Sequence, residues 1–153
     1  MQLTMTGEYA VRAMIHLSAQ PFGTVVQISD ISKQWNIPEN FLRKISAQLA
    51  SAELITSHRG INGGIRLGRP AETLTILDVI EAVEGKISLN KCLMSEKTCP
   101  RDEWCQVHML WAEAQSKLKE ILTKKSLAEL AAENISRRTA LEENQKPLPA
   151  CYT

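Results

Sequence analysis

The stretch that decides the fold runs from Pro38 to Leu67 and reads PENFLRKISAQLASAELITSHRGINGGIRL. Its first half has the three-and-four spacing of apolar residues that one face of an α-helix needs, and Pro38 suits the first position of such a helix. We therefore predict a helix over residues 38–50. The side chains expected to point inward are Phe41, Leu42, Ile45 and Leu49, and those expected to point outward are Asn40, Arg43, Lys44 and Gln48.

The second half of the stretch predicts a β-hairpin. Leu54–Thr56 and Ile65–Leu67 read as two short strands. Residues 59–64 between them hold three glycines and an asparagine, which accept the positive backbone angles of a hairpin tip. A plain connection is the simplest interpretation of such a hairpin, but Arg59 beside these glycines also suits close approach to a DNA groove.

A shorter helix comes before this stretch. Ser29 is a candidate cap for a helix through Ile31 and Trp35, which Asn36 should end. Two short helices followed by a basic hairpin indicate a winged helix-turn-helix, so the predicted fold class is mainly α with a small β-hairpin. In such a fold the helix over 38–50 would enter the major groove and Arg59 the minor groove. The candidate DNA-contacting residues are Asn40, Arg43, Lys44, Gln48, Arg59, Gly60, Asn62, Gly63 and Arg66.

Further helices are predicted on both sides of the winged helix. Thr6 can cap a first helix whose inward face is Ala10, Ala13, Met14 and Leu17. Thr75 and Asp78 resemble a capping box that starts a fourth helix, and Gly85 suits its end. Ser126 and Glu129 form another such box, for a short helix ending near Asn134.

A long helix is expected between the helix that starts at Thr75 and the one that starts at Ser126. Its apolar residues keep a three-and-four rhythm that predicts a dimerisation face, made of Val107, Leu110, Trp111, Ala114, Leu118, Ile121 and Leu122. The alternative is that this stripe packs back on its own domain. We divide the chain into a DNA-binding domain over 1–84, a cysteine loop with the dimerisation helix over 85–134, and a loosely ordered polar tail over 135–153.

Composition narrows the class of protein. The chain has 153 residues, no long apolar run and no signal-peptide pattern, so we expect a cytosolic protein that does not cross a membrane. Its net charge of +1 is uneven, since residues 1–70 carry seven Lys/Arg against four Asp/Glu, whereas residues 71–153 carry eleven against thirteen. A basic N-terminal half suits phosphate contacts. No catalytic constellation is found, which predicts that the protein is not an enzyme.

The remaining motif is a run of cysteines from Cys92 to His108, reading CLMSEKTCPRDEWCQVH. Three thiols and an imidazole are ligands that zinc or an iron–sulfur cluster takes. Cys105 and His108 lie three apart, so one helical turn would put both on one face. Buried structural thiols and a redox disulfide remain as alternatives, although the run is too polar for a buried core segment. Cys151, near the end, is expected to be a spectator.

These features together resemble the IscR/NsrR/RirA-type winged-helix regulators that carry an iron–sulfur cluster. The resemblance covers about residues 1–134 and includes MQLT, GEYAVRAM, HRGINGGIRLGRPA, TILDVIEAVEG and the three cysteines, in that order. It implies a homodimeric transcription regulator that binds a roughly palindromic operator in double-stranded DNA. It also implies that DNA affinity depends on the presence or redox state of the cluster, so that nitric oxide, oxygen or iron status is sensed.

The resemblance further implies a ligand set of Cys92, Cys99, Cys105 and His108, with Glu8 from the other subunit as the alternative fourth ligand. A [2Fe–2S] cluster is favoured and [4Fe–4S] is the alternative. The gap between Cys92 and Cys99 is one residue longer than in IscR-like members, and Arg43 stands where those members carry glutamate. A structural zinc, or a cluster-free regulator or adaptor controlled by a protein partner, are the other functions considered.

Overall fold

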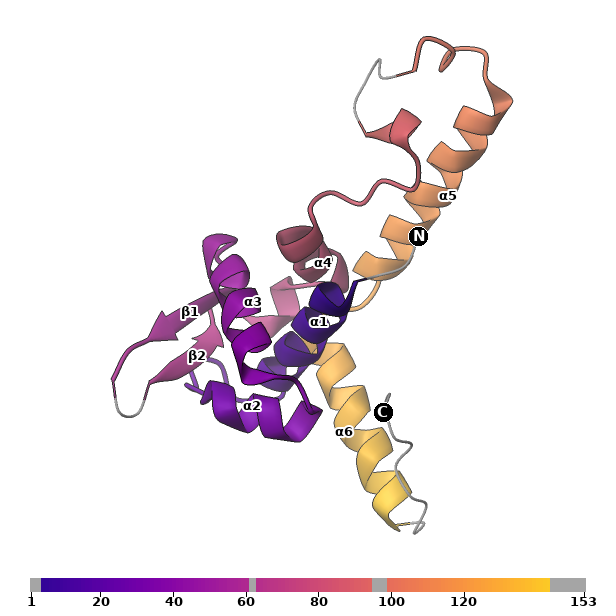
Figure 1. The fold of residues 1–153 in the computed structure, drawn as a ribbon. Helices are drawn as coiled ribbons and strands as arrows, with labels where there is room; N and C mark the ends of the chain where they lie inside the picture. Colours follow the sequence, from indigo (N-terminus) through magenta and orange to yellow (C-terminus); the bar gives the residue numbers. More distant parts are fainter. Residues whose placement is uncertain (1–3, 61–62, 95–98, 144–153) are drawn as a thin grey trace.

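Three N-terminal helices build the helix-turn-helix in the computed structural model, which describes residues 4–60, 63–94 and 99–143. They are α1 (Met5–Ser18), α2 (Ile28–Trp35) and α3 (Glu39–Ser51). α2 ends because Asn36 adopts the left-handed conformation, with φ 50° and ψ 47°, and the chain then turns into α3. Figure 1 shows α3 beside α1, with α2 below them. The predicted helix-turn-helix is confirmed.

The wing follows α3 directly. Strands β1 (Ile55–His58) and β2 (Gly64–Leu67) pair antiparallel, with Ile55 opposite Leu67. Val26, in the α1–α2 connection, bridges to Ile65 at the outer side of β2. The first strand begins one residue later than predicted, because the Leu54 amide still bonds the Leu49 carbonyl at the end of α3.

The C-terminal half consists of helices. The 3₁₀ helix η1 (Ala71–Thr73) precedes α4 (Ile76–Glu84), η2 (Lys91–Leu93) lies in the cysteine loop, and α5 (Gln106–Thr123) and α6 (Leu127–Glu143) end the described chain. Both predicted capping boxes are present, at Thr75 with Asp78 and at Ser126 with Glu129. Hydrogen bonds from Ser126 lower the pKa of Glu129. None of the helices within the described residues is long and apolar enough to cross a membrane.

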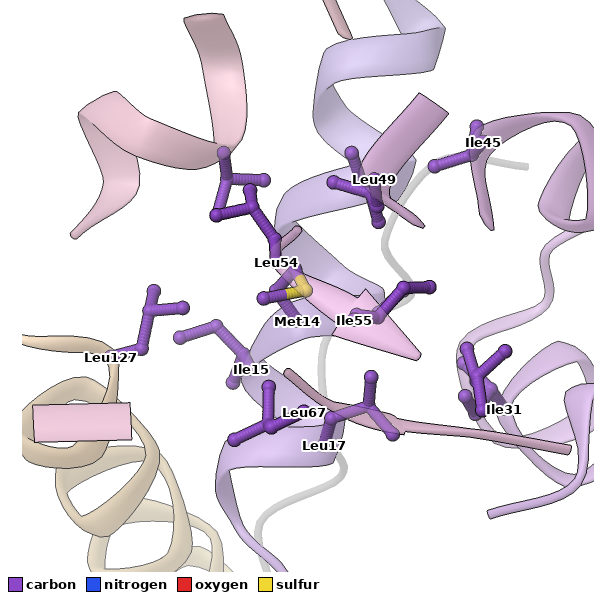
Figure 2. Close-up of a cluster of buried hydrophobic side chains, with 14 of the residues drawn as sticks. Met14, Ile15, Leu17, Ile31, Ile45, Leu49, Leu54, Ile55, Leu67 and Leu127 are labelled. Carbon is purple, nitrogen blue, oxygen red and sulfur yellow. The ribbon is translucent and has the colours of Figure 1, made fainter. Parts of the chain in front are cut away.

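One core joins the winged helix to the start of α6. Figure 2 shows side chains from α1, α3, the wing and α6 meeting at Met14. Each large aliphatic side chain fully buried there contributes about 1.5–3 kcal/mol. The predicted inward residues Ala10, Ala13, Met14, Leu17, Leu42, Ile45 and Leu49 are all buried.

Four local predictions are wrong. Phe41 is 45% exposed and meets the Tyr9 ring edge-on, because the buried face of α3 is centred on Leu42, Ile45 and Leu49 and position 41 lies at its edge. Thr4, not Thr6, caps α1, since its side chain accepts hydrogen bonds from two amides of the first turn. α2 starts at Ile28, so Ser29 lies inside its first turn. The helix predicted to end near Asn134 continues as α6 to Glu143, because polar helices are also stabilised by pairs one turn apart, here Arg138 with Glu142.

Candidate DNA interface and cysteine loop

The solvent face of α3 carries the predicted DNA-reading side chains. Asn40, Arg43, Lys44 and Gln48 are all exposed. Arg43 forms an ion pair with Glu39 one turn earlier. Gln48 donates its amide to the Val83 carbonyl of α4 at 3.5 Å, so this side chain contacts α4 as well as solvent.

The wing carries a second group of predicted DNA-contacting residues. Arg59 is exposed at its tip, beside Gly60, whose φ of +115° favours glycine. A Cβ on Gly63 would lie 2.5 Å from the His58 carbonyl, so the tip requires a residue without a side chain there. Arg66 donates to Thr56 across the two strands at 3.1 Å. Asn62, the other predicted contact, lies outside the described residues.

An open cleft of about 530 Å³ lies between the predicted DNA-contacting residues of α3 and those of the wing. It lies between the start of α2, α3 and the wing, and it is lined by both Arg43 and Arg59. His58 also lines it, and the Nε2 atom of this residue is buried without a hydrogen-bond partner among the residues described. His58 is not among the predicted DNA-contacting residues, and its position beside Arg59 is the local signal in the sequence that could have indicated it.

The cysteine loop lies at the far end of α5, away from the winged helix (Figure 1). Cys92 is in η2, Cys99 is in the connecting turn, and Cys105 is the residue just before α5. These three thiols are free and half-buried. His108 follows in the first turn of α5, and its Nδ1 atom is buried with no hydrogen-bond partner in the described part of the chain.

The loop residues fit a soft metal centre by their chemistry, since thiolates and imidazole are the ligands of iron–sulfur clusters and zinc. A buried ring nitrogen without a partner also suits a ligand, because leaving it unbonded is unfavourable. Over residues 4–60, 63–94 and 99–143, however, no three His, Cys, Asp or Glu side chains are already gathered around one point. Cys151 lies outside this part of the chain.

The alternative ligand Glu8 is in a different environment. It lies on α1 in the winged-helix body, which is α1 to α4 with the wing, and forms an ion pair with Arg12. The Arg12 guanidinium in turn lies 5.9 Å from the centre of the Tyr9 ring. The Glu8 carboxylate is therefore already paired with an arginine of its own helix.

The apolar stripe of α5 is open to solvent. None of its residues is buried, and Leu110 and Ile121 are 65% and 67% exposed. Val107, Trp111 and Ala114 are also exposed, whereas Leu118 and Leu122 are half-buried. In the single chain the alternative, that the stripe packs back on its own domain, fits the partly covered Leu118 and Leu122 but not the exposed Leu110 and Ile121.

Comparison with known families decides the class of protein. Residues 3–133 match the family model Rrf2, described as an iron-dependent transcriptional regulator. The chain belongs to the Rrf2 family. A relative from Azotobacter vinelandii, named as an HTH-type transcriptional regulator, is 34% identical over 132 residues, which are 86% of this chain and 80% of the relative. Another, from Haemophilus influenzae, is 33% identical over 94% of this chain and 96% of its own length.

Solved structures agree with this Rrf2 assignment. CymR of B. subtilis, titled a global cysteine regulator, has a TM-score of 0.71 and 28% identity, covering 87% of this chain and 98% of that one. IscR of T. potens has a TM-score of 0.69 and 25% identity over 97% and 94%. The predicted winged-helix fold and family resemblance are confirmed. Rrf2 proteins and these relatives are transcriptional regulators, so the prediction that the chain is not an enzyme is confirmed too.

Proposed function

We propose that this Rrf2-family regulator is a homodimer that binds double-stranded DNA and senses redox, nitric oxide or iron status through an iron–sulfur cluster. The observation that carries the DNA-binding part is the cleft lined by both Arg43 of α3 and Arg59 of the wing. Two cations from separate elements on one open surface suit the spaced phosphates and bases of a duplex. In this proposal α3 enters the major groove and Arg59 the minor groove.

Dimerisation rests on the exposed stripe of α5. A helix with apolar side chains as exposed as Leu110 and Ile121 is stabilised when a second copy covers it. A helix-turn-helix dimer reads two half-sites about one DNA turn apart, which corresponds to a roughly palindromic operator.

The sensing part rests on the cysteine loop. Cys92, Cys99 and Cys105 would hold a [2Fe–2S] cluster, with His108 or Glu8 of a second subunit as the fourth ligand and [4Fe–4S] as the alternative cluster. His108 is supported by its unpartnered, buried Nδ1, whereas Glu8 would first have to leave Arg12. When bound, such a cluster supplies a centre that changes its charge or is lost on reaction with oxygen or nitric oxide.

The DNA-binding proposal is tested by Arg59→Ala, measured by fluorescence anisotropy on duplexes from the protein's own promoter. We expect affinity to fall by about 1–3 kcal/mol if Arg59 contacts the groove. Arg137→Ala is the matched control, since this residue is also exposed and belongs to α6, which extends away from the wing in Figure 1. Equal affinity of both variants would remove Arg59 from the interface.

The cluster proposal is tested by Cys99→Ala in protein purified without oxygen. Visible absorbance and iron content should be lost, while Cys151→Ala should keep both. Mössbauer spectra of the unaltered chain then separate the two cluster types. Colourless protein with one zinc per chain would favour the structural-zinc function over the iron–sulfur function. Metal-free protein that still binds DNA would favour control by a protein partner.

A further inference from the structure

The cysteine-bearing arm, defined as residues 85–123, meets the winged-helix body at the last turn of α4. Figure 1 shows α4 at the base of α5, and α4 is also packed on α1 and α3. α5 runs antiparallel along α4, since Lys119 of α5 pairs with Glu81 and Ser126, just after α5, bridges to Thr75. The turn from Glu81 to Glu84 is thus a place where a change in the arm can reach the body.

On the arm side, two hydrogen bonds hold residues 85–90 between α4 and α5, and an ion pair joins the two helices directly. The Glu81 carboxylate accepts the Ile87 amide at 3.2 Å and pairs with the Lys119 ammonium at 3.3 Å. The Leu89 amide donates to Gln115 Oε1 at 3.0 Å. Both acceptors are only half-buried, and they define the register between this segment and α5.

On the body side, the same turn contacts two helices. The Val83 carbonyl accepts the Gln48 side-chain amide of α3 at 3.5 Å. The Glu84 carboxylate accepts the Gly7 amide at 3.1 Å and the Thr4 hydroxyl at the start of α1. Gln48 stands on the face of α3 that the proposed function directs to DNA, so the turn holds one of the candidate DNA-contacting side chains.

We infer that Glu81 and Gln115 are positioning residues that couple the state of the cysteine loop to the DNA-reading face of α3. The inference rests on the proposed function, because it concerns how that site is regulated. Cys92 lies three residues after Leu89, and His108 lies two helical turns before Gln115. Joining Cys92 to His108 through one centre therefore holds together the two segments that the Leu89–Gln115 hydrogen bond joins. By linkage, whatever strengthens this register also favours the α4 turn that holds Gln48.

The test compares DNA affinity with and without the cluster in Gln115→Ala and Glu81→Ala full-length protein. Removing one hydrogen bond of the coupling should reduce the ratio of the two affinities by about three- to tenfold. Iron content, visible absorbance and the affinity of cluster-free protein should stay as in the unaltered chain. Gln115→Glu, which keeps an acceptor for the Leu89 amide, should restore the ratio. Glu113→Ala is the matched control, since this exposed α5 side chain has no hydrogen-bond or ion-pair partner among the described residues.

Hydrogen exchange supplies a readout that does not depend on DNA. The Ile87 and Leu89 amides should exchange more slowly when the cluster is bound, and this protection should be lost in the corresponding alanine variant. An unchanged affinity ratio in both alanine variants, or loss of iron in either, would overturn the coupling while leaving the proposed function in place. If the unaltered chain binds DNA equally well with and without the cluster, both the coupling and the proposed sensing function are overturned.

Discussion

The winged-helix body buries its large apolar side chains, whereas the arm exposes them. Leu42, Ile45 and Leu49 of α3 are fully buried against α1 and the wing. On α5, with the same three-and-four spacing, Leu110 and Ile121 face solvent. Equal periodicity thus leads to opposite burial, because the body supplies other elements to pack against and the arm of a single chain does not.

This difference indicates two kinds of stability. A body with a filled core is stable by its own contacts, and its surface can carry charged groups such as Arg43 and Arg59 without being reshaped. An arm with an open apolar stripe and an unpartnered His108 depends on what binds it. We therefore expect ligand binding or dimerisation to stabilise the arm more than the body.

The largest expected effect comes from emptying the body's core. Leu49→Ala removes a side chain with 0% exposure, so it loses transfer free energy and leaves a cavity. We expect the free energy of unfolding to fall by about 2–5 kcal/mol, measured by urea denaturation followed by circular dichroism. Leu118→Ala removes a side chain of the same size that is half-buried on α5, so it should lower the free energy of unfolding clearly less. Equal losses in the two variants would contradict the difference in packing between body and arm.

The next effect concerns the arm's open face. Leu110→Glu changes a side chain that is 65% exposed, so the stability of one chain should change by less than about 0.5 kcal/mol. If a second copy covers this face, the buried charge should weaken the dimer tenfold or more, as seen by sedimentation. Glu113→Lys, also exposed on α5, is the control for a change of charge alone. A variant that stays fully dimeric would show that Leu110 lies outside the interface.

A smaller effect concerns a buried histidine that joins α1 to α2. Trp35 Nε1 donates to His16 Nδ1 at 3.2 Å, so the ring nitrogen that accepts must be unprotonated. Burial lowers the pKa of His16, which Asp30 opposes to a smaller degree. Because the unfolded chain takes up this proton near pH 6.5 and the folded chain resists it, stability should fall as pH drops below about 6.5.

The slope from His16 should be at most about 1.4 kcal/mol per pH unit. His16→Gln, which keeps a hydrogen-bond acceptor but cannot titrate there, should flatten the fall in melting temperature between pH 7.5 and 5.5. An unchanged slope in this variant would assign the pH dependence to other groups.

Local patterns predicted most of the fold but less of the site. The burial of Leu42 and Leu49 and the two capping boxes depend on residues three or four apart, which a sequence displays directly. The inward prediction for Phe41 was wrong because position 41 lies at the edge of the buried face of α3, and the sequence does not show how wide that face is. The contact of Gln48 with Val83 joins residues 35 apart, and no local signal reports it. The outward face of α3 was predictable, whereas its link to α4 was not.

The smallest expected effect concerns the charges on the body's surface. Arg43 is paired with Glu39, and both side chains are largely exposed, so this ion pair adds at most about 0.5 kcal/mol to stability. Glu39→Gln should therefore leave the melting temperature almost unchanged, yet it frees the Arg43 guanidinium and removes a negative charge beside the proposed phosphate contacts. We expect DNA affinity to rise about two- to fivefold at low salt, with the gain shrinking as salt is added. Glu53→Gln, an exposed carboxylate beyond the end of α3, is the control, and weaker binding by Glu39→Gln would mean that the pair itself positions Arg43 for DNA.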